Sequence, residues 1–320
     1  MMLYRLNDVD PMECTRGRYD AVFFASGYEK RTTHVARMLE RDSSGSVVVL
    51  GFDTWVDEPQ RVANDAYFDE AWKSRPRVIS ANDDTPIYEL CRAISPTSRE
   101  SVRILVDYSS MSRLWYAGLL NWARYLPGVQ EVVIDFVYSF GRYTEDRPQM
   151  VIDDIVAIPG CEGGAMRISK SVAVFGLGFD QFATLCVLDR LEPDLVYSFL
   201  ASPGSDATYL DRVRSCNEEI IQKHAKCTLD LPLGSVERTF CGLSELIAPH
   251  ILESDVTLVP MGPKPHVLAS ILLSLRFIEV ACLRVSGHGA TPARVEATGE
   301  VIATRVHFRH QDDTANGRQS

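Results

Sequence analysis

Two stretches of this 320-residue chain place hydroxyl side chains or glycine close to a cation, a combination that can bind phosphate. The first set is Ser109, Ser110, Ser112 and Arg113, and the second is Ser26, Gly27, Tyr28 and Arg31. Hydroxyl and backbone N–H groups donate hydrogen bonds to phosphate oxygens, and a guanidinium neutralises their charge. Small hydroxyl residues also serve as helix N-caps, so each stretch has a structural interpretation beside the functional one.

The second half of the chain offers a related set at corresponding positions: Gly176, Gly178, Ser202, Gly262 and Lys264. The Gly-Leu-Gly run at 176–178 is similar to the start of a dinucleotide fingerprint, but the third glycine is missing. A GxxxxGK[ST] loop and a Gly-x-Ser-x-Gly elbow are both absent from the sequence. The eight cysteines form no CxxC pair and the histidines lack ligand spacing, so we expect no cofactor and no metal.

Carboxylates at the ends of apolar runs allow a catalytic interpretation. Glu29, Asp107 and Asp180 are the candidates for acid and base, and Asp53 and Glu218 could join them. Asn217 could also point into a cleft. Because carboxylates at these positions commonly cap helices instead, the sequence leaves catalysis and structure as alternatives.

Continuous apolar runs alternate with amphipathic stretches of helical spacing, which predicts parallel strands covered by helices on both faces. The predicted strands are 21–25, 47–50, 78–80, 103–107 and 132–138, followed by 172–175, 196–200, 228–231, 257–259 and 280–285. The spacings within the two groups agree within a few residues. Such a long-period repeat predicts an α/β fold of two tandem Rossmann-like lobes, each with a mainly parallel five-stranded sheet.

The repeat also sets the expected domains. We predict a first lobe over 1–147, a connector over 148–170, a second lobe over 171–310 and a disordered tail over 311–320. Residues after Ser286 are expected to add a terminal strand pair, and 207–226 to form one long helix. Because parallel strands carry ligands beyond their carboxyl ends, the candidate residues should line a cleft between the lobes.

Charge and hydropathy exclude several classes of protein. The formal net charge of −10 and the pI near 5.2 disfavour bulk binding of duplex nucleic acid, which needs clustered cations. The N-terminal residues show no secretory h-region, and no apolar run reaches the roughly 18 residues of a membrane helix. With the scattered cysteines, these features favour a cytoplasmic protein without a membrane partner.

The run Ile-Leu-Val-Asp-Tyr-Ser-Ser-Met-Ser-Arg at 104–113, followed by an apolar helix, resembles the fourth-strand signature of CRISPR-associated Rossmann-fold (CARF) domains. Ser26 and Gly27 would correspond to the other ligand loop of that family, and two fused units are similar to the SAVED arrangement. The resemblance implies a cyclic oligonucleotide ligand in prokaryotic antiviral defence. Met111 in the loop and Pro260 in place of Asp107 depart from the pattern.

Two hypotheses follow. In the first, the chain is a sensor or regulatory subunit that binds a phosphate-bearing nucleotide or cyclic oligonucleotide and signals to a separate effector protein. Homo-oligomerisation is compatible with that role. In the second, it is an enzyme acting on a nucleotide or phosphosugar by hydrolysis or glycosyl transfer, with carboxylates such as Glu29 as acid and base.

Overall fold

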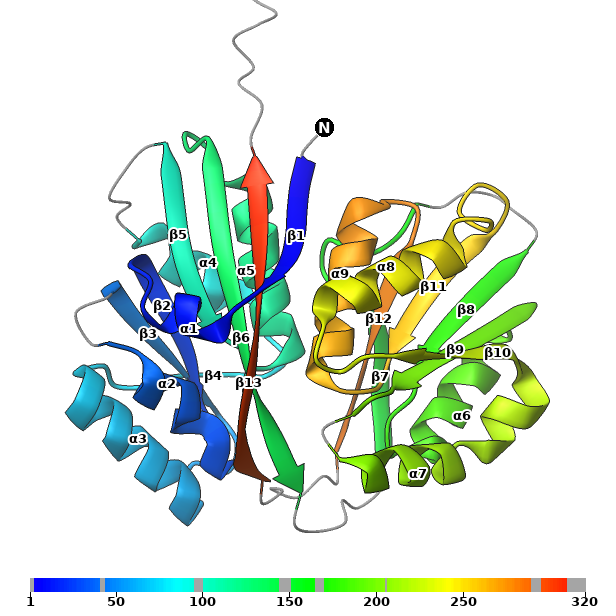
Figure 1. The fold of residues 1–320 in the computed structure, drawn as a ribbon, viewed down its shortest axis with the longest axis horizontal. Coiled ribbons are helices and arrows are strands. Elements are labelled where there is room, and N and C mark those ends of the chain that lie inside the picture. Colours follow the sequence, from blue (N-terminus) through cyan, green and yellow to red (C-terminus); the bar gives the residue numbers. More distant parts are fainter. Residues whose placement is uncertain are drawn as a thin grey trace, which may run out of the picture. The chain divides into compact units, whose positions relative to one another are not determined.

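The ten predicted strands are present, and they belong to two separate sheets in a computed structural model (Figure 1). The model describes residues 3–40, 44–94, 100–143, 151–164, 170–204, 206–288 and 295–309. The chain divides into two compact units, one made of Met1–Gly141 with Arg294–Ser320 and one made of Arg142–Ala293. The predicted tail at 311–320 lies outside the described residues. The predicted α/β class is therefore confirmed, with two mostly parallel mixed sheets.

The first unit contains a sheet that has seven strands within the described residues, in the order β1-β13-β6-β5-β2-β3-β4. These strands are β1 (Leu3–Val9), β2 (Tyr19–Ser26), β3 (Ser44–Phe52), β4 (Arg77–Ile79), β5 (Ser101–Asp107), β6 (Glu131–Tyr143) and β13 (Val295–Arg309). The five from β2 to β6 pair in parallel, and β13 pairs with β1 in antiparallel register. The predicted parallel core is thus extended by two strands from the chain ends.

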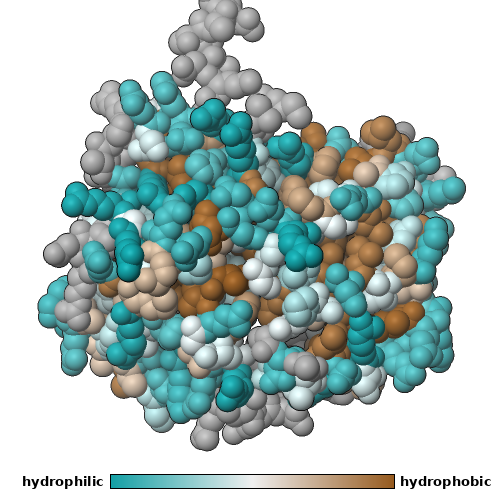
Figure 2. All heavy atoms as spheres, in the orientation of Figure 1, coloured by the Kyte–Doolittle hydropathy of each residue, from teal (hydrophilic) through white to brown (hydrophobic). Residues whose placement is uncertain are grey.

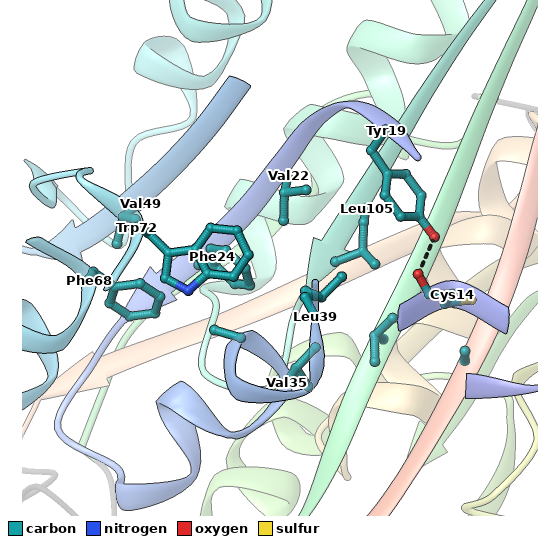
Figure 3. Close-up of a cluster of buried hydrophobic side chains, with 13 residues drawn as sticks. Cys14, Tyr19, Val22, Phe24, Val35, Leu39, Val49, Phe68, Trp72 and Leu105 are labelled. Atoms are coloured by element: carbon teal, nitrogen blue, oxygen red, sulfur yellow. Dashed lines mark hydrogen bonds between the residues drawn. The ribbon is translucent and has the colours of Figure 1, made fainter. Parts of the chain in front are cut away.

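The connections between these strands contain the helices of the first unit. They are α1 (Pro11–Thr15), the 3-10 turn η1 (Lys30–Thr33), α2 (His34–Met38), α3 (Pro59–Trp72), α4 (Thr85–Arg92) and α5 (Arg113–Tyr125). On one face of the sheet, Phe24 of β2 packs against Phe68 and Trp72 of α3, with ring centroids 5.3 and 5.2 Å away (Figure 3). Alternate strand residues point to the opposite face, where Figure 1 draws α4 and α5.

The second unit repeats the parallel core. Its strands are β7 (Val151–Ala157), β8 (Ser171–Gly176), β9 (Leu195–Ala201), β10 (Ala225–Leu231), β11 (Asp255–Pro260) and β12 (Ala281–His288), in the order β10-β9-β8-β11-β12-β7. The helices are α6 (Gln181–Leu191), α7 (Ala207–Cys216), the π-helical turn η3 (Ile220–His224), α8 (Val236–Ile247) and α9 (Lys264–Arg276). Counted along the chain, the five parallel strands of both units follow the order 3-2-1-4-5.

Three sequence predictions differ in part from the structure. The predicted connector contains β7, which pairs with β12 in antiparallel register. The residues expected to end the second lobe form β13 in the first sheet instead of a terminal pair. The helix predicted over 207–226 is interrupted at Asn217 and continues into the π-helical turn η3, which ends at His224 before β10 starts at Ala225. All three differences depend on distant partners that a local pattern does not specify.

Surface properties follow the composition. Hydrophilic residues cover much of the face drawn in Figure 2. Four cysteines are buried, whereas Cys186, Cys227 and Cys241 are exposed. Within the part of the chain that the structure describes, no helix has the length and apolarity needed to cross a bilayer.

A buried charge cluster fastens β13 into the first sheet. The carboxylate of Asp135 on β6 is fully buried and accepts hydrogen bonds from Arg305 Nε at 2.6 Å, Arg103 Nη2 at 2.9 Å and the Tyr19 hydroxyl at 2.8 Å. Burial raises the pKa of a carboxyl, but the hydrogen bonds from Arg305 and Arg103 outweigh burial and hold the pKa of Asp135 below its ordinary value. The charge on Asp135 is therefore compensated on several sides.

Removing one partner should show how much this cluster stabilises the first unit. We expect Arg305→Met to lower the free energy of unfolding by about 3 kcal/mol, because Asp135 would stay buried with one compensating cation fewer. Urea unfolding of the full chain measures the change. The control is Arg309→Met on the same strand, whose side chain is 72% exposed and should change stability by less than about 0.5 kcal/mol. Equal effects of the two variants would contradict this role of Asp135.

Candidate functional site

The strand order of the first unit contains a switch point, where the connection after one strand and the connection after its neighbour run to opposite sides of the sheet. β2 lies between β3 and β5, so the chain runs from β2 toward β4 on one side and toward β6 on the other. In parallel α/β sheets such a switch point leaves a crevice at the carboxyl ends of the two central strands, and ligands bind there. Here the adjoining loops are 27–29 after β2 and 108–112 after β5. Both are sequence-predicted ligand loops.

Side chains bridge these two loops. Ser110 Oγ donates to Glu29 Oε2 at 3.3 Å and lies 2.9 Å from Thr32 Oγ1. Arg31 donates from Nε to Glu29 at 2.7 Å and from Nη1 to the carbonyl oxygen of Ser139 at 2.9 Å. All five residues are buried. Glu29, Arg31 and Ser110 are therefore brought together, and they bind one another and shape the loops.

The end of β5 is fixed in a similar way. Asp107 Oδ1 accepts from both the backbone N–H and the hydroxyl of Ser109, at 3.0 and 2.6 Å. The Ser109 hydroxyl in turn accepts from the backbone N–H of Ser139 at 2.8 Å. Ser112 donates its hydroxyl to the carbonyl of Ala81 at 2.7 Å. These contacts give Asp107, Ser109 and Ser112 structural tasks, which position the start of α5.

Sequence reasoning missed the contribution of α3. Asn64 Nδ2 donates to the carbonyl oxygens of Gly27 at 2.8 Å and Glu29 at 3.0 Å. Asp65 accepts from the Ser26 hydroxyl and from Arg61 Nε. From the sequence alone, the polar residues of α3 predict a solvated helix. A signal was available, because these residues recur at helical spacing on the face that also carries Phe68 and Trp72.

Arg113 differs from the other cations at this edge. It is the first residue of α5, half-buried, and its guanidinium makes no hydrogen bond or ion pair with any other described residue. The Ser112 side chain does not cap this helix, since its hydroxyl is bound to Ala81. The N-terminus of a helix carries partial positive charge, which disfavours a cation there by roughly 0.3–1 kcal/mol. The positive charge of Arg113 is therefore unfavourable at this end of its own helix.

Aromatic rings lie on the β3 side of this switch point. The ring centroid of Phe52, at the end of β3, lies 6.4 Å from that of Tyr28 and 4.5 Å from that of Trp115. Tyr28 is half-buried, and Trp115 is fully buried. The predicted Gly27–Tyr28 loop therefore has an apolar wall on the β3 side.

The glycines of the second unit have a packing role. A Cβ atom on Gly178 would lie 2.5 Å from the carbonyl oxygen of Met261, and one on Gly262 would lie 2.8 Å from that of Leu177. On Gly176 a Cβ would meet the ring of Phe199 at 2.6 Å. The loops after β8 and β11 are thus in backbone contact at the switch point, and only glycine fits between them.

The other candidates of the second unit also have structural partners. Asp180 caps α6 by accepting from the N–H of Ala183, and Ser202 donates its backbone N–H to Leu231. Lys264 begins α9 and has an interaction partner. The predicted cleft position of Asn217 is wrong: this residue is fully buried, and its Nδ2 donates to the carbonyl oxygen of Gly178 at 2.8 Å. It holds the loop after β8 as Asn64 holds the loop after β2.

Two further carboxylates from the catalytic interpretation lie on the surface. Asp53 follows β3 and is exposed, and the exposed Glu218 accepts from Gln222 on the next turn at 2.8 Å. Comparison of the chain with protein-family models, curated proteins and solved structures found no match.

The contrast between the two loops predicts different responses to the same substitution. A Cβ on Gly27 would have only ordinary contacts, the nearest at 3.5 Å to Phe52, so Gly27→Ala should change the free energy of unfolding by less than about 1 kcal/mol. Gly178→Ala should destabilise by about 1–3 kcal/mol, because the new methyl overlaps the Met261 carbonyl. Urea unfolding of both variants tests this, and a tolerated Gly178→Ala would disprove the packing role.

A buried histidine near the start of α9 makes the second unit sensitive to acid. His266 is 1% exposed, with its ring centroid 5.5 Å from that of Phe199 and the backbone of Leu231 and Pro232 beside it. Burial lowers the pKa of His266 from 6.5 to about 4. The unfolded chain therefore binds a proton more readily than the folded one. Stability should be full above pH 6.5 and fall as the pH drops toward 4.

Between pH 7.5 and pH 5 this histidine should cost about 2 kcal/mol of folding free energy. His266→Leu should remove that part of the pH dependence, as measured by urea unfolding across the range. The control His224→Leu alters an exposed histidine and should leave the pH dependence unchanged. An identical pH profile for wild type and His266→Leu would contradict the assignment.

Proposed function

We propose that the chain binds a phosphate-bearing nucleotide at the switch point of the first unit, between the loops after β2 and β5. In this proposal both units are Rossmann-like, and only the first one binds the ligand. The proposal rests on Arg113. This half-buried cation has no partner among the described residues, and it lies at the end of its helix where a positive charge is unfavourable. A bound phosphate would reverse that penalty, because it pairs with the guanidinium and accepts from first-turn N–H groups.

The surrounding contacts support binding with the loop already in shape. The hydroxyls of Ser109 and Ser110 are engaged in holding the loops together, so they position the binding groups without contacting the phosphate themselves. Since α3 also fastens the loop after β2 through Asn64, little ordering would be needed when the ligand binds. Preorganisation of this kind raises affinity without adding contacts.

The proposed role is that of a sensor. Glu29 is paired with Arg31, Asp107 with Ser109, and Asp180 with the start of α6, so each candidate acid has a structural partner. The resemblance to CARF and SAVED proteins adds a cyclic oligonucleotide as ligand and antiviral defence as setting. A separate effector chain in the cytoplasm would then receive the signal.

Arg113 variants test the site. A panel of linear and cyclic nucleotides is screened by melting shift, where a ligand at 100 times its dissociation constant stabilises by about 2.7 kcal/mol. Arg113→Ala should abolish that shift, while the melting temperature without ligand stays equal or rises slightly as the helix loses an unfavourable charge. Arg113→Glu should do the same, with a larger gain in the unliganded protein.

Arg124→Ala is the matched control, because it removes the same charge from the last turn of the same helix. It should lower the melting temperature slightly and keep the nucleotide shift. The proposal fails if no nucleotide shifts the wild type, or if Arg113→Ala retains the full shift. Mass analysis of the recovered ligand separates sensor from enzyme: intact nucleotide supports binding, and turnover that Glu29→Gln removes supports catalysis.

A further inference from the structure

One tryptophan is exposed, and it lies next to the proposed site. Of the four tryptophans in the sequence, Trp72, Trp115 and Trp122 are at most 8% exposed, whereas Trp55 is 49% exposed. Trp55 belongs to the short loop at 53–58 that connects β3 to α3. A large aromatic ring left in water at this position is therefore a feature that packing does not explain.

The backbone of Trp55 is strained as well. Its φ angle is +54°, in the left-handed region that non-glycine residues seldom adopt. Glycine or asparagine would occupy the position at lower cost, and neither leaves an apolar ring in solvent. Strain of this kind persists where the surroundings fix it, and it concentrates at ligand-binding positions. Exposure and strain are independent observations on one residue.

Both ends of the loop are fixed to the proposed site. At its start, the Phe52 ring lies against Tyr28, and the Phe52 carbonyl accepts from Arg61 Nη1 at 2.8 Å. At its end, α3 carries Asn64, which donates to the carbonyl of Gly27. The loop that presents Trp55 is therefore held beside the loop after β2.

The charges of the 53–58 loop decide which part of a nucleotide would lie beside it. The loop carries Asp53, Asp57 and Glu58 around Trp55, which would repel a phosphate. The cation and the helix N-terminus lie at the other loop, with Arg113. A nucleotide would thus be oriented with its phosphate at the start of α5 and its base toward the 53–58 loop.

We propose that Trp55 is the stacking platform for the nucleobase of the ligand. This inference rests on the proposed function and adds the ligand's orientation and its need for a base. Stacking on an aromatic side chain is tolerant of base identity, so Trp55 contributes affinity and the acidic loop contributes the orientation.

The test uses the nucleotides that shift the melting temperature in the screen, together with inorganic phosphate. Binding of a nucleotide should quench tryptophan emission and shield it from acrylamide, because Trp55 is the tryptophan that acrylamide reaches. Trp55→Ala should weaken nucleotide binding roughly 5- to 150-fold, and Trp55→Phe should restore most of it. Phosphate alone should bind wild type and Trp55→Ala equally, whereas Arg113→Ala should lose both probes.

Two controls separate stacking from a general effect on the loop. Val56→Ala removes the neighbouring exposed side chain and should leave nucleotide affinity unchanged. Trp55→Gly should raise the melting temperature without ligand, since it relieves the backbone strain, and still lose nucleotide affinity. Unchanged nucleotide affinity in Trp55→Ala overturns the stacking role and leaves the phosphate site standing. Absence of nucleotide binding in the wild type overturns both proposals.

Discussion

The structure of the site depends on one topological constraint, the reversal of chain direction between β2 and β5. Because β2 is followed by β3 on one side and β5 joins it on the other, the two connections leave the sheet edge in opposite directions. Neither the connection after β2 nor the connection after β5 passes over the carboxyl ends of both strands, so a gap remains between the two connections. The start of α5 and the loop after β2 must therefore meet at this edge, and the residues placed there decide whether the gap is filled or kept for a ligand.

The loops at the switch point are joined differently in the two units. The five parallel strands have the same order in both units, and both units use an asparagine, Asn64 or Asn217, to hold the glycine carbonyl of the first loop. In the second unit the opposed loops touch through backbone atoms at Gly178 and Gly262. In the first unit they are joined by side chains such as Ser110, which leaves Gly27 with only ordinary contacts. The same scaffold thus closes one switch point with backbone and bridges the other with polar side chains.

Much of the fold could be predicted from the sequence, because buried parallel strands are continuous apolar runs that local reading detects. What could not be predicted were the partners of β7 and β13, since an antiparallel strand carries no local mark of the sheet that it joins. The β13 attachment depends on Asp135, a single carboxylate inside an apolar run, whose cations come from distant strands.

The candidate site was predicted in part, for a similar physical reason. The loops that contain Ser26 and Ser110 were identified because strand ends are local features. The use of each side chain was not, because a glycine that admits a phosphate and a glycine that admits another loop have the same sequence signature. Gly178 belongs to the second kind. Polar residues on the buried face of α3, such as Asn64, were overlooked because polarity usually indicates a solvated surface.

Backbone hydrogen exchange in the presence and absence of a bound nucleotide tests the central claim most directly. The account predicts slower exchange for the amides at 27–29 and 113–116 when the nucleotide is present, because the ligand accepts from the start of α5 and orders the facing loop. The amides at 177–180 and 261–267 should exchange at the same rate with and without nucleotide. Protection confined to the second unit, or no protection at 113–116, would contradict the assignment of the site to the first unit.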